Sequence, residues 1–350
     1  MAPTFVHRQA AASNKQMHIW IDESGSFAGV GEMPSPSCVG ALVVPDAKLA
    51  DLERLYGRLR RNLPKVKGEV KGRLLTARQV ADVVGVLSRS EALFSVSLFE
   101  FGMHTVEDIR THQAELAARL GANITEEHHD VVRNWVAQTK AQLLAFKPPA
   151  YVQSIVTMEL MRKVLGHATM YFSQRRPEEL ARFNWVIDGK EPLLDKTPWE
   201  KWWSDLLLPY MQAQSLVEPG PRFELGDYSH MDRYHSMSYP EYLPPPRDPE
   251  DKGERVTNLR SIFGDHVRFS TDPEPGLELV DILTNGIRRA LIGHLEPEGW
   301  RAIRSIMIHR KDQYIEVLRL NDRNLRLPYH DVLLEFKAGG KIMLIPRHRR

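Results

Sequence analysis

The stretch that decides the fold is Met17–Gly25, MHIWIDESG, in which an apolar run leads into two adjacent carboxylates and a Ser-Gly turn. Ile19 and Ile21, with Trp20 between them, predict a strand buried on both faces, as a central strand is. Such a strand would hold Asp22 at the edge of the sheet, where burying a carboxylate is costly unless a cation or a donor meets it. The competing interpretation is that Asp22 only caps the turn.

A second strand has the same ending. Residues 182–188, RFNWVID, are apolar and finish in Asp188, which Gly189 follows. If the two strands are parallel neighbours, they bring both carboxylates to one edge, where open α/β sheets place their sites. The alternative is that Asp188 is an ordinary turn residue.

A third acid stands out because of its surroundings. Asp281 lies within the apolar helical stretch 276–291, GLELVDILTNGIRRAL, one turn from Glu278 and one turn from Asn285. A carboxylate on a core-facing helix normally has a charged partner or a metal. The alternative is a buried ion pair with a base such as Arg288 or Lys71.

Together these three acids predict a site for divalent metal. Oxygen ligands favour Mg²⁺ or Mn²⁺, and two such ions about 4 Å apart can activate a water and stabilise a leaving oxygen. Without a cation, acids crowded together would repel one another and raise at least one pKa.

Composition limits the class of protein. The 350 residues are 42% hydrophobic and 26% charged, as in ordinary globular proteins. No apolar run reaches the roughly 20 residues that span a bilayer, residues 1–16 lack a signal-peptide core, and a single cysteine excludes an internal disulfide. We therefore expect a cytoplasmic protein without a membrane partner.

The net charge is only +2, but basic residues are concentrated in two segments. Residues 54–73 hold eight basic residues and one acid, Glu69, and residues 323–350 hold seven basic residues and two acids. This distribution suits a phosphate-rich partner, namely DNA or RNA. The alternative is a solvated helix face and a frayed terminus.

Periodicity and turn residues predict an α/β domain. Further strands are expected at 38–44, 92–101 and 265–270. Helices are expected after Asp46 and Thr76, each as an N-cap, and in three segments over 104–172. Residues 332–345 predict a C-terminal β-hairpin around Gly339 and Gly340. We expect a disordered 1–16, one domain over 17–295 with a helical insertion at about 104–148 and a loop insertion at about 196–258, and an extension over 296–350 formed by a helix and the β-hairpin.

Three tryptophans lie on the first turns of the predicted helix that begins with a capping box at 197–200. They could form a stacking platform for bases, although such a cluster more often anchors an inserted helix by packing. The cluster consists of Trp199, Trp202 and Trp203.

The motifs DESG at 22–25, EVKG at 69–72, the strand-end Asp188, and HVRFS at 266–270 followed by GLELVDIL at 276–283 resemble the domain of unknown function 3800 family. The resemblance covers roughly residues 17–101 and 150–293. It implies a ribonuclease H-like fold, a mixed sheet flanked by helices, and a metal-dependent nuclease often found in phage-defence or mobile-element settings.

The resemblance also implies roles for single residues. Asp22, Asp188 and Asp281 would be catalytic metal ligands, Glu69 or Glu23 would complete the set, and Lys71 would contact a phosphate or steady the carboxylates. Where the family has Gln and Ala in its late helix, this chain has Glu278 and Val280, so Glu278 either joins the metal site or merely caps. The alternatives are an ion pair of Glu69 with its neighbours and a solvated Lys71.

The favoured hypothesis is a metal-dependent nuclease or phosphodiesterase. A nucleic-acid- or partner-binding module without turnover is the alternative from another class. An aspartyl phosphatase ranks last, because its second Asp would stand where this chain has Ser24. The sequence leaves open a homodimer and the choice between DNA and RNA.

Overall fold

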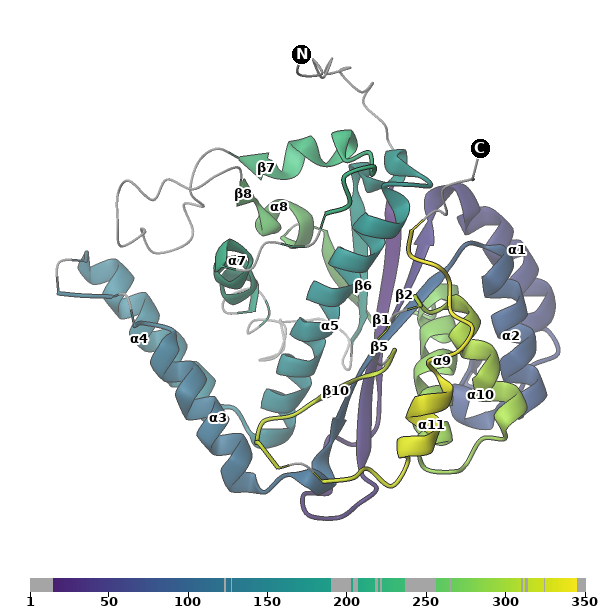
Figure 1. The fold of residues 1–350 in the computed structure, drawn as a ribbon, viewed down its shortest axis with the longest axis horizontal. Coiled ribbons are helices and arrows are strands. Elements are labelled where there is room, and N and C mark those ends of the chain that lie inside the picture. The colour runs from purple at the N-terminus through teal and green to yellow at the C-terminus, as the bar shows by residue number, and fades with distance from the viewer. Residues whose placement is uncertain are drawn as a thin grey trace.

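A mixed six-stranded sheet runs through the middle of the molecule in the order β10-β5-β2-β1-β6-β9 (Figure 1). β2 is antiparallel to β1 and β5, whereas the pairs β1–β6, β6–β9 and β5–β10 are parallel. Every strand except β2 therefore points the same way, and their carboxyl ends share one edge. The strands are β1 (Met17–Ser24), β2 (Pro36–Pro45), β5 (Leu93–Glu100), β6 (Phe183–Asp188), β9 (Val267–Ser270) and β10 (Glu316–Leu318).

This computed structural model describes residues 15–189 except 123 and 127, residues 203, 207–217, 220 and 222–236, and residues 256–344 except 265, 310, 312, 313 and 324. The expected disorder of residues 1–16 falls almost wholly outside this range. So do the capping box at 197–200, Trp199 and Trp202. Trp203 is described: it is buried and packs edge-on against Phe263, as a packing anchor would.

Helices cover both faces of the sheet (Figure 1). Because side chains alternate along a strand, Ile19 and Ile21 join one core cluster and Trp20 joins the other. On the face of Ile19 lie α3 (Val106–Arg119), α4 (Asp130–Ala145), α5 (Pro148–Phe172), α7 (Leu208–Val217) and α8 (Leu259–Phe263). On the face of Trp20 lie α1 (Asp46–Arg60), α2 (Ala77–Arg89), α9 (Pro275–Leu291), α10 (Pro297–Ile303) and α11 (His330–Glu335).

Short elements complete the described chain. The 3₁₀ helices are Gly72–Leu74, Phe101–Met103, Pro177–Ala181, Ser229–Tyr234 and Arg304–Ile306. Two small antiparallel pairs join β3 (Lys65–Val66) to β4 (Glu69–Val70) and β7 (His235–Ser236) to β8 (Val256–Thr257). The sequence did not predict the β3–β4 hairpin, which lies inside the basic segment.

Several predictions of local structure are confirmed. The chain has an α/β fold with β1 in the interior of a mixed sheet. Thr76 caps α2 through a capping box with Gln79, and α3, α4 and α5 are the three expected helical segments. Asp46, in contrast, is the first residue of α1 and not its N-cap, which is Pro45.

The predicted C-terminal β-hairpin is wrong. Residues 330–335 form α11, and Lys341 instead makes an isolated bridge with Ile308. The reason is packing: Leu333 and Phe336, three residues apart on one helical face, are both buried, and Phe336 packs against Trp300. The same C-terminal region also supplies β10, which extends the sheet beyond β5.

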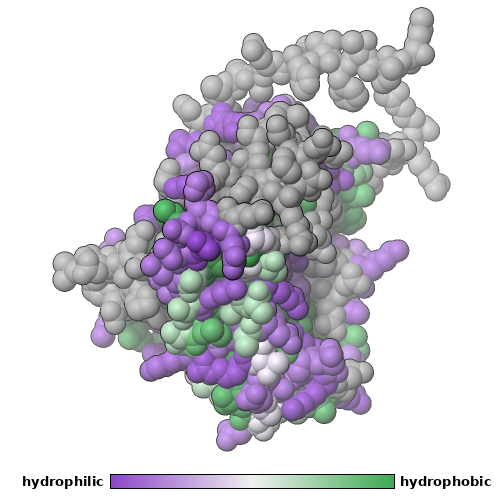
Figure 2. All heavy atoms as spheres, turned by 90° about the vertical axis from the view of Figure 1, so that its left-hand side faces the viewer, coloured by the Kyte–Doolittle hydropathy of each residue, from purple (hydrophilic) through white to green (hydrophobic). Residues whose placement is uncertain are grey.

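The surface is mixed in character. Figure 2 looks at the side that carries α3 and α4 and shows hydrophilic surface interspersed with smaller hydrophobic areas. Among the described residues, no helix combines the length and apolar character needed to cross a membrane.

Candidate active site

Asp22 and Asp188 lie side by side because of strand register. β1 and β6 are parallel, as the sequence required for a shared edge, and Ile21 pairs with Ile187. The next residue on each strand is the aspartate, and both lie on the α9 face, since Trp20 and Val186, two positions earlier, belong to the core cluster on that face. β1 does not end at Asp22, however, but continues to Ser24 along β2.

Asp281 approaches the same face from α9. The backbone N–H of Gly72 donates to Oδ2 of Asp281 at 2.7 Å. One turn further on, Asn285 Nδ2 donates to Ser24 Oγ at 3.2 Å, which ties α9 to the end of β1. The bases considered as ion-pair partners are engaged elsewhere, because Arg288 donates to the carbonyl of Pro36 and Lys71 pairs with Glu69.

Electrostatics shows that the carboxylates share one environment. Burial raises the pKa of Asp22 well above its usual range, and the charges of Glu23, Asp188 and Asp281 raise it further, against the lowering effect of the Glu23 N–H, which donates to Asp22 Oδ1 at 2.7 Å. Burial, with the charge of Glu23, also raises the pKa of Asp188 to about 6. Burial raises the pKa of Asp281 as well. Each of the three acids is thus costly to ionise without a cation.

The DESG turn is built on a tight approach. Gly25 has φ of +122°, and a Cβ there would lie 2.9 Å from the Cα of Ser37. Only glycine suits this position. Glu23 alternates with Asp22 and so points to the opposite face of β1, yet its charge still acts on Asp22 and Asp188.

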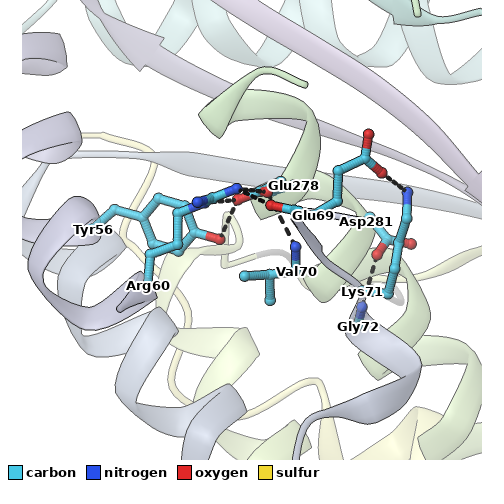
Figure 3. A network of polar contacts seen from close by, with 9 residues as sticks. Tyr56, Arg60, Glu69, Val70, Lys71, Gly72, Glu278 and Asp281 are labelled. Carbon is cyan, nitrogen blue, oxygen red and sulfur yellow. Dashed lines mark hydrogen bonds and ion pairs between the residues drawn. The ribbon is translucent and has the colours of Figure 1, made fainter. Parts of the chain in front are cut away.

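Glu69 lies on β4 and Lys71 directly after that strand, near Asp281 (Figure 3). Glu69 Oε2 and Lys71 Nζ form an ion pair at 2.5 Å, which is the alternative considered for Glu69. Burial alone would lower the pKa of Lys71, but the hydrogen bond and charge of Glu69 outweigh it and raise that pKa, with help from Asp281 and Asp188. Lys71 is therefore a cation held within the electrostatic range of the carboxylates.

Glu278 is not part of this group. Its carboxylate is bound by Arg60, by the hydroxyl of Tyr56 and by the N–H of Val70 (Figure 3). With both oxygens engaged by these donors, Glu278 links α9 to α1 and β4. The structure thus gives no geometric support to the prediction that Glu278 is a metal ligand.

A divalent cation suits the chemistry of the site. Asp22, Asp188 and Asp281 offer hard oxygen ligands, and a cation would offset the burial and the neighbouring negative charges that raise the pKa of these groups. Over the described residues, however, no group of three or more His, Cys, Asp or Glu side chains is arranged to hold a metal ion. The donor types therefore fit a cation, while the ligand geometry is not preformed.

Asn285 is a candidate that the sequence reasoning missed. Its Oδ1 is buried and has no hydrogen-bond partner among the described residues. A buried carbonyl oxygen without a hydrogen-bond donor is costly. This one could accept a hydrogen bond from water or coordinate a cation. The available signal was its spacing, four residues after Asp281 on one helical face.

Comparison with known proteins adds no assignment, because no family model, curated protein or solved structure matched this chain. The resemblance to the domain of unknown function 3800 family accordingly stays a prediction from its motifs.

Proposed function

We propose that this protein is a metal-dependent phosphodiesterase that cleaves nucleic acid. The observation that carries the proposal is the placement of Asp22, Asp188 and Asp281, from two parallel strands and a helix. Burial raises the pKa of each, and the charges of Asp188 and Asp281 raise that of Asp22 further. Such a group of acids is stabilised by a divalent cation.

The roles of the residues follow from their positions. A divalent cation held by Asp22, Asp188 and Asp281 would supply an activated water and stabilise charge on the phosphate. The Gly72 N–H fixes the orientation of Asp281 through Oδ2. Lys71 provides a positive charge beside the acids for a phosphate oxygen. The exposed bases of residues 54–73 would hold the flanking backbone.

A ribonuclease H-like scaffold is part of the proposal. Three strands in an antiparallel meander, β1, β2 and β5, are followed by two parallel strands, β6 and β9, on the other side of β1. This arrangement supports the fold that the motifs imply, with the acids at the carboxyl ends of the central strands. β10 is an addition at the β5 edge.

One observation favours a second candidate, a nucleic-acid-binding module without turnover. The ligand geometry is not preformed among the described residues, and Lys71 is paired with Glu69. A cleavage assay separates the two candidates.

The assay uses the full chain with labelled single-stranded DNA, single-stranded RNA, both duplexes and the hybrid, in EDTA, Mg²⁺ and Mn²⁺. The variants are Asp22→Asn, Asp188→Asn and the control Asp51→Asn, which changes an exposed carboxylate on α1. We expect metal-dependent cleavage by the wild type and the control. In the two site variants, the cleavage rate should fall by at least roughly 10–100-fold, which is the usual effect of substituting a residue that hydrogen-bonds a metal ligand. Metal-dependent binding or cleavage that both variants retain would refute the proposal.

A further inference from the structure

We propose that Glu278 is a positioning residue that locks the β3–β4 hairpin, so that Lys71, next to the Gly72 amide that Asp281 binds, is placed to receive a phosphate of the nucleic-acid strand. The locking of the hairpin rests on geometry alone, whereas the role toward phosphate rests on the proposed function.

The first step is the set of contacts at Glu278, which is 6% exposed. Arg60 donates from Nε to Oε2 at 2.6 Å and from Nη2 to Oε1 at 2.5 Å, a two-pronged pairing that fixes direction as well as distance (Figure 3). The hydroxyl of Tyr56 donates to Oε2 at 2.9 Å, and the N–H of Val70 donates to Oε1 at 3.1 Å.

The second step is that the same guanidinium holds the tip of the hairpin. Nη2 of Arg60 also donates to the carbonyl of Gly68 at 2.7 Å. The two turn residues, Lys67 and Gly68, have φ of 51° and 87°. A lysine in the left-handed region is unfavourable, so the turn depends on anchoring from outside, and Arg60 supplies it.

The third step concerns the segment between two anchors on one helix. Val70 is bound by Glu278, and Gly72 is bound by Asp281, three residues later on α9. Lys71 lies between these two fixed residues, so the position of its backbone is set by α9. A Cβ at Gly72 would lie 2.8 Å from the Cα of Ile282, which shows how closely the segment is seated.

The fourth step is energetic. A buried ion pair gives little stability over well-packed apolar residues, so stability alone does not account for the choice of Glu278 and Arg60. What the pair adds is a defined direction for the hairpin. The same stretch of chain carries four more basic residues that are exposed, which suits a phosphate backbone: Arg61, Lys65, Lys67 and Arg73.

The test uses Glu278→Gln, which keeps the size and an acceptor but loses the charge that holds Arg60. Arg60→Gln is the second variant in case the first fails to fold. For the exchange readout, Arg54→Gln is the matched control, since it removes an arginine of the same helix whose partner is Asp51. Lys71→Met alone and combined with Glu278→Gln completes a double-mutant cycle.

Two readouts are measured. In hydrogen exchange, the amides of Val70 to Gly72 should exchange at least about tenfold faster in Glu278→Gln. A tenfold change corresponds to a loss of roughly 1.4 kcal/mol from the free energy of local opening. The rates should be unchanged in the control. In EDTA, anisotropy with a labelled oligonucleotide should show binding weakened about tenfold by Lys71→Met and a similar loss in Glu278→Gln. The double variant should bind no more weakly than Lys71→Met, because Glu278 acts through Lys71.

Each result decides one part. Unchanged exchange at these amides would overturn the locking role. Faster exchange with unchanged oligonucleotide binding, or additive losses in the double variant, would overturn the role toward phosphate. A wild type that neither binds nor cleaves any oligonucleotide would refute the proposed function together with the phosphate role, while the exchange result would still decide the locking role.

Discussion

Asp22 and Asp188 lie side by side on the parallel strands β1 and β6, because Ile21 is paired with Ile187 and the next residue on each strand is the acid. Both carboxylates face α9, where Asp281 adds a third charge to the surroundings of Asp22. A fold that gathers acids in this way lowers its own stability unless a cation neutralises them. The predictions below test that cost and the parts around it.

The pH dependence of stability should report Asp188. Its pKa is about 6 in the folded protein against 3.8 for an ordinary aspartate. Between these values the folded state keeps a proton that the unfolded state has lost, so this group lowers the unfolding free energy as pH rises from about 4 to 6. In EDTA, Asp188→Asn should therefore be more stable than wild type by about 1–3 kcal/mol at pH 7.5, with a smaller difference at pH 4. Urea unfolding at several pH values measures this. A constant difference across the range would contradict it.

Gly72 should be intolerant of a side chain. The alanine Cβ would meet the Cα of Ile282 at 2.8 Å and the carbonyl oxygen of Asp281 at 2.9 Å. Gly72→Ala should lower the unfolding free energy by about 1–3 kcal/mol and reduce cleavage. Gly57→Ala on α1 is the matched control, because nothing lies within 4 Å of its Cβ. It should stabilise by about 0.5–1 kcal/mol. Equal effects of the two changes in thermal unfolding would disprove the close seating of Gly72.

The exposed lysines of the β3–β4 hairpin should contribute to the salt dependence of binding. Replacing Lys65 and Lys67 together with glutamine removes two cations, so the slope of log affinity against log salt should fall in magnitude by about 1.5. Fluorescence anisotropy in EDTA between low and moderate salt measures the slope. The pair Arg133→Gln and Arg162→Gln on α4 and α5 serves as the control and should leave it unchanged. If the slope changes equally for both pairs of substitutions, the nucleic-acid backbone does not bind at the β3–β4 hairpin.

The C-terminal region should be part of the folding unit. The hydroxyl of Tyr329 donates to Oε2 of Glu100 at 2.7 Å, and Glu100 is fully buried. Tyr329→Phe leaves that buried carboxylate without one donor and should cost about 1–3 kcal/mol. Glu335→Gln, which breaks an exposed ion pair with Arg301, should cost less than about 1 kcal/mol. Chemical denaturation compares the two, and a negligible loss in Tyr329→Phe would show that this contact adds nothing.

The sequence predicted those parts of the structure that depend on local patterning. The continuous apolar run around Trp20 predicted the interior strand, and the Asp that follows the apolar residues of each of two strands predicted the shared edge. Thr76 predicted the start of α2 through its capping box. In each case residues close in sequence determine the outcome.

The parts that the sequence did not predict depend on distant contacts. The short apolar runs on either side of Gly339 and Gly340 predicted a hairpin, whereas residues 330–335 form a helix whose end packs on the core through Phe336 and Trp300. Glu278 lies one turn before Asp281 on α9, a spacing that suits a ligand, and the ion pair that it forms with Arg60 of α1 could not be read from that spacing. The β3–β4 hairpin has a Lys-Gly turn, a weak signal beside Asn-Gly.

The most direct test of the central claim is a Mn²⁺ titration of the full chain followed by electron paramagnetic resonance, which counts bound ions without requiring turnover. We predict saturable binding by the wild type and by Asp51→Asn, and its loss in Asp22→Asn, Asp188→Asn and Asp281→Asn. Mn²⁺ binding that these three variants retain, or its absence from the wild type, would contradict the account.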